Sequence, residues 1–434
     1  MVERVVYKFG GASVKDADSI RNVGNIIGKC DAVNIIVVVS AMGKSTNALE
    51  KVVEETFEQT GKGIKLLLEI KKEHNAVVND LGLERDQHLE ELNNLFSNAE
   101  NFLHQIKQDV HSYDFIYDQI VSLGELCSTR IIASYLNQKT NLKPDWIDSR
   151  KVIRTDNTYR EGRVNWNETS WLFQKSILPR FKDNKVLLTQ GFLGGDENGN
   201  TVTLGREGSD YSAAIFSYCT DADYMAIWKD VPGILTADPK LFENVSLIDK
   251  LSYLEAIEMT YYGAKVIHPK TIKPLQNKNI PLWVKSFEDS DSVGTLISGT
   301  GDLRYPPVVV VEKNQRLLFI STKDLSFVAE HHLSKLFELF SRHRIKVNLM
   351  RNTAISFTVC VTDRPDRINA FLSEISQEFD IEDEKNLELI TIRHYQEPVV
   401  DAIKKGKIVL FEERIPKTVQ LVLKALPLLK RKDD

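Results

Sequence analysis

The stretch "RVVYKFGGASV" at residues 4–14 sets the pattern for the fold. An apolar run leads to Lys8, and two adjacent glycines, Gly10 and Gly11, follow. Near-continuous apolar sequence is typical of a strand buried on both faces, and glycines let backbone N–H groups approach an anion. Taken alone, the stretch leaves two readings equally open: a phosphate-binding loop, or a tight turn beside a surface lysine.

Further apolar runs of the same kind recur along the chain. They are "NIIVVVS" (34–40), "KVLLTQGF" (185–192), "DYMAIWKD" (223–230) and "IPLWVKS" (280–286). Helix-like segments such as "DADSIRNVGNIIGKC" (16–30) and "SDYSAAIFSYCT" (209–220) lie between them. Strands that alternate with helices predict an α/β fold, with a mostly parallel sheet sandwiched by helices.

Two regions depart from this alternation. Residues 46–112 carry apolar residues at helical spacing and predict a helical insertion. The glycine- and proline-containing segment 298–307 predicts a linker. Residues 316–395 then follow the βαββαβ order of a ferredoxin-like α+β domain. We therefore expect a first domain at residues 1–299 and a second at residues 300–434.

Composition excludes several classes of protein. The formal net charge of -5 argues against a general nucleic-acid binder. The four cysteines form no CxxC pair, so we expect free, mostly buried thiols rather than a zinc site or disulfides. The N-terminus has no signal-peptide pattern and no apolar run reaches about 20 residues, which predicts a cytoplasmic protein that does not bind membranes.

A second candidate anion site is "LGREGSDYSAA" (204–214). Ser209 or Asp210 is expected to be the N-cap of a helix here. Capping does not explain Arg206, because a cation at a helix N-terminus opposes the helix dipole. Arg206 makes sense if its guanidinium grips a carboxylate or phosphate together with the N–H groups of that helix.

Two later loops add cations, although each could also be a solvated surface segment. "WKDVPGILTADPKL" (228–241) follows a predicted strand and is a candidate nucleotide-binding loop. "MTYYGAKVIHPKTI" (259–272) places Lys265 shortly before a predicted helix. By contrast, "SAMGKST" (40–46) is not a P-loop, because Val38 stands where the motif requires its first glycine.

Taken together, these segments resemble the aspartate kinase family over nearly all of the first ~300 residues. The matching segments, in order, are "KFGGASV", "LGELCSTR", "TQGFLG", "LGREGSDYSAA", "WKDVPGILTADP", "SYLEAIEMTYYGAKVIHP", and "IPLWVKS" with "GTLI". The resemblance implies the amino-acid kinase fold with a C-terminal ACT domain. It also implies phosphorylation of the side-chain carboxylate of L-aspartate by MgATP, the first step toward lysine, threonine, methionine and diaminopimelate.

The resemblance also implies roles for individual residues. Lys8, Asp210 and Lys265 are the expected catalytic residues. Thr46, Glu125, Arg206 and Ser209 are expected to bind aspartate. The expected ATP-binding residues are Gly10, Gly11, Ser40, Lys229, Asp230, Gly233, Lys240 and Val266. No side chain is expected to be a dedicated metal ligand, and Mg²⁺ is expected with the nucleotide.

The sequence also departs from the family pattern. Ala12, Glu207, Lys229 and Leu235 replace residue types common in the family, and the second ACT unit looks truncated. Lysine-sensing members carry acidic residues where this chain has Asn348 and Ala354, which predicts weak or absent lysine feedback. The ACT region could bind another amino-acid effector, and we expect a homodimer. Two alternatives stay open: a kinase acting on glutamate or N-acetylglutamate, and a regulatory pseudokinase.

Overall fold

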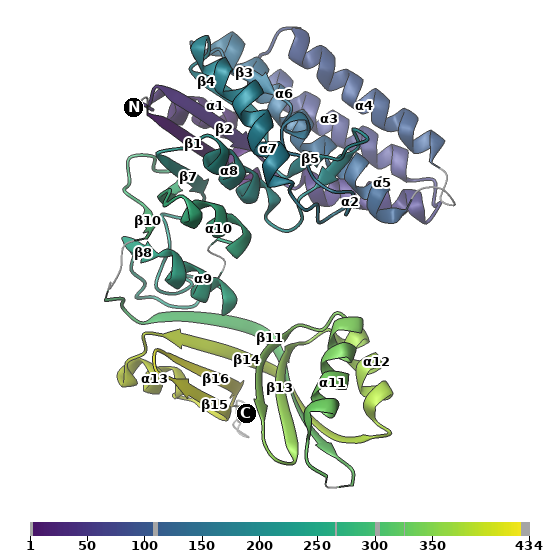
Figure 1. Cartoon of the computed structure of the whole chain (residues 1–434), viewed down its shortest axis with the longest axis vertical. Coiled ribbons are helices and arrows are strands. Elements are labelled where there is room, and N and C mark those ends of the chain that lie inside the picture. Colours follow the sequence, from purple (N-terminus) through teal and green to yellow (C-terminus); the bar gives the residue numbers. More distant parts are fainter. Residues whose placement is uncertain (1–2, 107–111, 265–266, 300–303, 325, 427–434) are drawn as a thin grey trace, which may run out of the picture. The chain divides into compact units, whose positions relative to one another are not determined.

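The computed structural model describes residues 3–106, 112–264, 267–299, 304–324 and 326–426 (Figure 1). Its internal contacts divide the chain into two compact units. The first unit comprises residues 1–234, 247–257 and 267–303, and the second comprises 235–246, 258–266 and 304–434. The domain limits expected from the sequence, 1–299 and 300–434, remain predictions. Each unit is described by itself below.

The first unit contains a sheet of eight strands in the described residues, in the order β3-β4-β2-β1-β7-β9-β10-β8. The strands are β1 (Arg4–Phe9), β2 (Asn34–Val39), β3 (Asp145–Ile147), β4 (Val186–Gln190), β7 (Tyr224–Lys229), β8 (Lys250–Ser252), β9 (Leu282–Ser286) and β10 (Thr295–Ser298). All pairs from β3 to β9 are parallel, and β10 is antiparallel to β9. The apolar runs predicted as strands are therefore confirmed, and their carboxyl ends meet at one edge.

Helices connect and cover these strands. They are α1 (Ala17–Gly28), α2 (Ser45–Phe57), α3 (Gly63–Asp80), α4 (Gln87–Gln105), α5 (Tyr113–Val121), α6 (Leu123–Lys139), α7 (Trp166–Leu172), α8 (Gly208–Cys219) and α10 (Pro269–Asn277). Helix α9 (Tyr253–Tyr261) begins in this unit, and its residues 258–261 belong to the second unit. Short helical segments are η1 (Gly11–Val14), η2 (Ser149–Lys151), η3 (Phe173–Ile177) and η4 (Leu178–Lys182). A turn that contains Asn198 and Gly199 joins the antiparallel strands β5 (Leu193–Gly195) and β6 (Thr201–Thr203).

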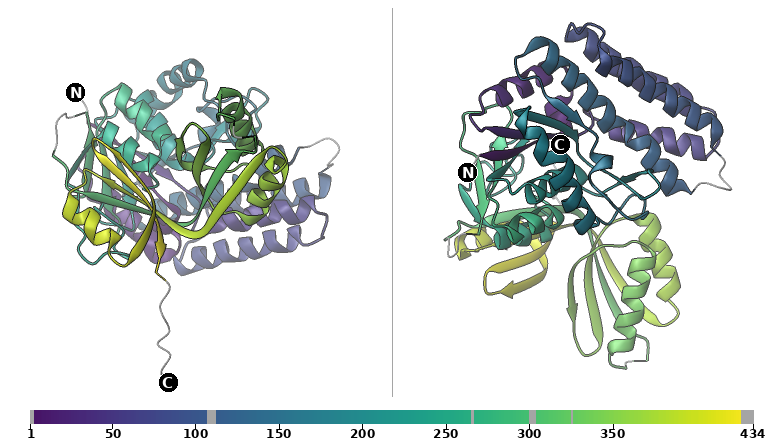
Figure 2. Two further views of the ribbon diagram at one scale, coloured as in Figure 1. Left: turned by 90° about the horizontal axis from the view of Figure 1, so that it is seen from below. Right: turned by 45° about the horizontal axis from the view of Figure 1, so that its top comes forward.

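The predicted helical insertion is present. Helices α2, α3 and α4 follow β2, and α3 and α4 lie side by side (Figures 1 and 2). Leu67, Ile70, Leu92 and Phe96 are buried and belong to the same apolar core as the central strands. The insertion is therefore an extension of the core of the first unit.

The second unit is built on an antiparallel sheet in the order β12-β13-β11-β14-β16-β15. Its elements are β11 (Val308–Thr322), α11 (Glu330–Arg342), β12 (Val347–Asn352), β13 (Ser356–Thr362), α12 (Pro365–Ile375), β14 (Phe379–Arg393), α13 (Glu397–Lys404), β15 (Lys407–Ile415) and β16 (Thr418–Ala425). The βαββαβ order confirms the predicted ferredoxin-like domain.

The long strands β11 and β14 serve two halves of this unit. Helices α11 and α12 pack on one end of the sheet through Leu336, Phe340 and Phe371. Helix α13 packs on the other end through Val400. The C-terminal segment forms two strands and one helix within the described residues, and its strand β16 pairs with β14, which also belongs to the first half. The predicted truncation of a second ACT unit remains a prediction.

Two further expectations from the sequence concern the cysteines and membrane-spanning helices. Cys30, Cys127, Cys219 and Cys360 are free and buried, as predicted. Among the described residues, no helix is both long enough and apolar enough to cross a bilayer.

Candidate active site

Lys8 lies in β1 near its carboxyl end, and its ammonium contacts the carboxylate of Asp210 at 2.6 Å. Both side chains are less than a tenth exposed. Burial by itself would raise the pKa of Asp210, but the charges of Lys8 and Lys229 lower that pKa below its ordinary value. The structure thus brings two of the predicted catalytic residues together as a buried ion pair.

The glycine turn after β1 lies directly against this pair. A Cβ on Gly10 would be 3.5 Å from the Nζ atom of Lys8. A Cβ on Gly11 would be only 2.9 Å from the carbonyl oxygens of both Ala41 and Gly43. The N–H of Gly43 donates to the carbonyl oxygen of Gly11 at 2.9 Å. Only glycine fits at position 11, and its fit brings the loops after β1 and β2 together.

The loop after β2 contains two further predicted residues. The N–H of Ser40 donates to the carbonyl oxygen of Phe9 at 3.1 Å, so Ser40 follows the end of β1 closely. The hydroxyl of Ser128 in α6 donates to the carbonyl oxygen of Ser40 at 2.7 Å. Thr46 is half-buried in the first turn of α2. Both predicted residues therefore belong to the loop and helix start at this edge of the sheet.

Glu125 lies in the first turn of α6 and is 3% exposed. Burial raises the pKa of Glu125 to about 8, although the N–H of Ala41 and the charge of Lys8 act in the opposite direction. Its Oε2 atom has no hydrogen-bond partner among the described residues. A buried carboxyl with a free oxygen beside a lysine is suited to receive a cationic group of a ligand.

The N-terminus of α8 corrects one prediction. The N-cap is Glu207, and Ser209 and Asp210 lie inside the first turn. Glu207 has φ 54 and ψ 29, so the chain enters the helix earlier than the serine and aspartate pattern indicated. Asp210 binds Lys8 instead of capping. Ser209 packs closely on Gly191: a Cβ added to Gly191 would lie 2.6 Å from the Cβ of Ser209.

Arg206 is exposed in the loop before α8, between Gly205 and Glu207. Gly205 has φ 75, a conformation in which glycine is favoured. The guanidinium is therefore accessible at the start of the helix whose first turn contributes Asp210. This arrangement fits the predicted role of Arg206 as a grip for an anionic group.

Comparisons with known proteins show the family to which the chain belongs. The sequence model described as "Amino acid kinase family" matches residues 3–286. Lysine-sensitive aspartokinase 3 of Escherichia coli strain K12 is 31% identical over 402 residues, which covers 90% of this chain and 87% of that protein. The chain belongs to the aspartokinases of the amino acid kinase family.

Solved aspartokinases have the same fold. E. coli aspartokinase III in complex with lysine and aspartate has a TM-score of 0.80 and 28% sequence identity, covering 96% of this chain and 95% of that chain. The structure of the same enzyme with aspartate and ADP has a TM-score of 0.79 and 28% identity, covering 97% and 96%. The predicted fold class, an amino-acid kinase fold with an ACT-like C-terminal domain, is confirmed.

The residues predicted for the nucleotide side of this aspartokinase divide into three groups. Lys229 ends β7 and lowers the pKa of Asp210, which places its charge near the Lys8 pair. Asp230 is exposed and Gly233 is buried with φ 151 in the loop that follows. Lys240 belongs to the second compact unit, and Lys265 and Val266 lie outside the described residues. All six assignments stay predictions.

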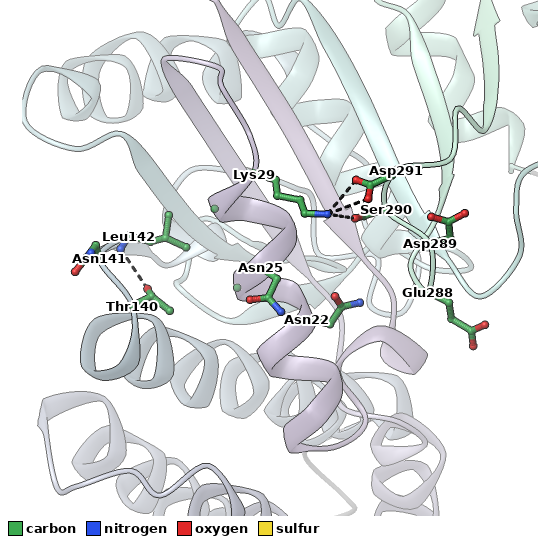
Figure 3. A pocket seen from close by; sticks show the side chains of 12 residues that line it. Asn22, Asn25, Lys29, Thr140, Asn141, Leu142, Glu288, Asp289, Ser290 and Asp291 are labelled. Carbon is green, nitrogen blue, oxygen red and sulfur yellow. Dashed lines mark hydrogen bonds and ion pairs between the residues drawn. The ribbon is translucent and has the colours of Figure 1, made fainter.

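A hollow of about 720 Å³ lies elsewhere in the first unit, beside α1 (Figure 3). Asn22 and Asn25 of α1 and Lys29, which follows that helix, line it together with residues 140–142 and 288–291. The ammonium of Lys29 contacts Asp291 at 2.9 Å. None of the predicted site residues lines this hollow.

Sequence reasoning missed two groups at the site. The N–H of Ala41 lowers the pKa of the buried Glu125 carboxyl, and no sequence pattern marks a main-chain donor of this kind. The carboxylate of Glu207 accepts the N–H of His268 at 3.0 Å. The sequence carried a signal for Glu207, because Glu207 is one of the positions that depart from the family pattern.

Proposed function

We propose that this aspartokinase transfers the γ-phosphoryl group of ATP to the side-chain carboxylate of L-aspartate, giving 4-phospho-L-aspartate and ADP. The buried pair of Lys8 and Asp210, 2.6 Å apart and beside the glycine turn, is the observation that carries the proposal. The relative named lysine-sensitive aspartokinase 3 and the solved complex of E. coli aspartokinase III with aspartate and ADP support it.

The chemistry needs no base to activate the nucleophile. An aspartate carboxylate has a pKa near ~3.9 and is ionised at neutral pH. The barrier is the approach of one anion to another, so the site must supply positive charge and fixed N–H dipoles. Lys8 offers an ammonium and the Gly10–Gly11 turn offers main-chain donors without obstruction by a Cβ. Arg206 would bind a substrate carboxylate, and Glu125 would receive the substrate ammonium.

We assign the ATP phosphates to the Gly10–Gly11 turn, because a Cβ on Gly10 would meet only the Nζ atom of Lys8, at 3.5 Å, and its absence leaves the main chain open beside that ammonium. We assign Ser40, Lys229, Asp230, Gly233, Lys240 and Val266 to the nucleotide, and Lys265 to the phosphates, as proposals. Among the described residues, no group of three or more His, Cys, Asp or Glu side chains could hold a metal ion. Mg²⁺ would therefore come with the ATP phosphates, and we derive no step from it.

The test is a hydroxylamine trap of the acyl phosphate in the presence of MgATP. Aspartate should give a hydroxamate, whereas glutamate and N-acetylglutamate should give little. Turnover of glutamate or N-acetylglutamate without turnover of aspartate would transfer the assignment to another carboxylate kinase of this fold. Absence of any turnover by folded protein would favour a regulatory pseudokinase.

We further propose how the enzyme is regulated, how it assembles and where it is located. The second unit, with its ACT-like fold, is the region expected to bind an amino-acid effector and to pair two copies in a homodimer. Lysine and aspartate are both bound in a solved complex of E. coli aspartokinase III. We propose a cytoplasmic enzyme. Sedimentation of the purified chain with and without amino acids would test the dimer.

A further inference from the structure

Glu207 has an unusual backbone for its residue type. Its φ of 54 lies in the left-handed region, where a side chain with a Cβ is disfavoured and glycine is not. The residue is the N-cap of α8, yet its side chain makes no capping hydrogen bond to that helix. Capping therefore does not account for a glutamate at this position.

The side chain of Glu207 reaches another element instead. Its Oε2 atom accepts the main-chain N–H of His268 at 3.0 Å. His268 is the N-cap of α10, and its Nδ1 atom accepts the N–H of Lys270 at 3.2 Å. One carboxylate thus joins the loop before α8 to the residue that starts α10, across a sequence separation of 61 residues.

A second link runs in parallel. The ammonium of Lys270 lies 3.5 Å from the carbonyl oxygen of Leu204 and also faces the ring of Tyr211 in α8. Burial lowers the pKa of His268, Glu207 raises it, and Lys270 and Arg206 lower it. The charge of Arg206 is therefore close to this junction. Leu204 and Glu207, which lie before and after Arg206 in the sequence, therefore both contact the start of α10.

From these contacts we infer that Glu207 is a positioning residue for substrate binding: by accepting the His268 N–H it fixes the loop that presents Arg206. The inference rests on the proposed function, in which Arg206 binds a carboxylate of aspartate. A fixed loop lowers the entropy that substrate binding must remove, so the effect should appear in the KM for aspartate. A carboxylate acceptor also makes a stronger bond to an N–H than a neutral acceptor.

The experiment compares Glu207→Gly and Glu207→Gln in the full-length enzyme. Glycine suits the left-handed backbone, so Glu207→Gly should fold with an unchanged or higher melting temperature. Its KM for aspartate should rise about tenfold, the effect of losing one charge-assisted hydrogen bond, while kcat stays within about twofold. The KM for ATP should stay unchanged. Glutamine retains an acceptor oxygen and should recover most of the loss.

Asn279→Gly is the matched control. Asn279 has φ 54, is exposed, and follows the C-terminal end of α10. The Asn279→Gly substitution removes left-handed backbone strain without changing the loop of residues 204–208, so the kinetic constants of this variant should equal those of the wild type. A normal KM in Glu207→Gly would overturn the inference, as would equal damage in Glu207→Gln. Wild-type enzyme that turns over no aspartate would instead reject the proposed function, which separates the two failures.

Discussion

At the scale of single residues, the site combines one ammonium with two buried carboxyl groups whose pKa values are shifted in opposite directions. Lys8 contacts Asp210 directly, and the pKa of Asp210 is lowered. Burial raises the pKa of Glu125 to about 8, so this carboxyl is protonated at neutral pH before substrate arrives. The site therefore contains one ion pair and one neutral acid, and a substrate ammonium would favour ionisation of Glu125.

Replacement of Lys8 should affect the chemical step. Lys8→Met removes the ammonium proposed to offset the charge of the transferred phosphoryl group, so kcat/KM should fall about 100- to 1,000-fold. Lys29→Met is the control, because Lys29 forms an exposed ion pair with Asp291. The measurement is the aspartate-dependent hydroxamate rate, with thermal unfolding as a check on the fold. Undiminished activity in Lys8→Met would remove Lys8 from the proposed machinery.

The raised pKa of Glu125 predicts how stability changes with pH. The ordinary pKa of a glutamate carboxyl is 4.5, and the pKa of Glu125 in the folded protein is about 8. Between these values the folded state binds more protons than the unfolded state, so ligand-free stability from this group declines as pH rises from about 4.5 to about 8. Glu125→Gln is neutral throughout and should lose this decline. Melting temperatures of the two proteins should diverge in favour of Gln as pH rises, and parallel curves would contradict the prediction.

At the scale of elements, tight loops at the carboxyl ends of β1, β2 and β4 bring the site together. A Cβ on Gly11 would meet two carbonyl oxygens at 2.9 Å, and backbone atoms cannot rotate away. A Cβ on Gly191 would meet Ser209 of α8 at 2.6 Å. The loops are therefore packed to the limit of what glycine permits, and the spacing of the two turns depends on that packing.

Gly11→Ala should consequently separate the loops after β1 and β2. We expect a loss of about 1–3 kcal/mol in stability, as in overpacked cores, together with a higher KM for ATP. Gly28→Ala is the control, because a Cβ there meets no atom within 4 Å and the residue ends helix α1. The control should gain up to about 1 kcal/mol from helix propensity. Denaturant unfolding of both variants measures the contrast, and equal stability would show that the loops adjust freely.

Elements were predictable where local sequence determines them. Continuous apolar runs identified the central strands, and the segment starting at Asp16 gave a helix because its carboxylate accepts the N–H of Ser19 at 2.8 Å. The cap of α8 was predicted wrongly, since Asp210 is drawn to Lys8 by a contact 202 positions away in sequence. The strand start at Val308 was also missed, because the apolar run 308–311 adjoins the predicted linker.

At the scale of the whole molecule, the chain combines a kinase unit with a unit of the ACT type. Its internal contacts assign some residues before position 300 to the second unit. Residues 235–246 group with the second unit, and Phe242 packs on the core formed by β14, β16 and α13. The N–H of Val309 donates to the carbonyl oxygen of Thr236 at 2.8 Å. A predicted nucleotide loop therefore continues into the second unit. Linear sequence could not show this, because it depends on a contact between distant segments.

This organisation gives a final prediction on feedback by lysine. The amide nitrogen of Asn348 donates to Gln315 at 2.8 Å and to Thr362 at 2.9 Å, and its Oδ1 atom has no hydrogen-bond partner among the described residues, so the position carries a neutral group. Ala354 offers no polar side chain at all. An ammonium ligand needs a carboxylate partner when it is desolvated, and neither position supplies one. Millimolar lysine should therefore leave the hydroxamate rate within about twofold of its uninhibited value, because the charge-assisted contacts are missing. The same assay with threonine and methionine would identify another effector, whereas strong inhibition by lysine would show that the second unit binds it through other residues.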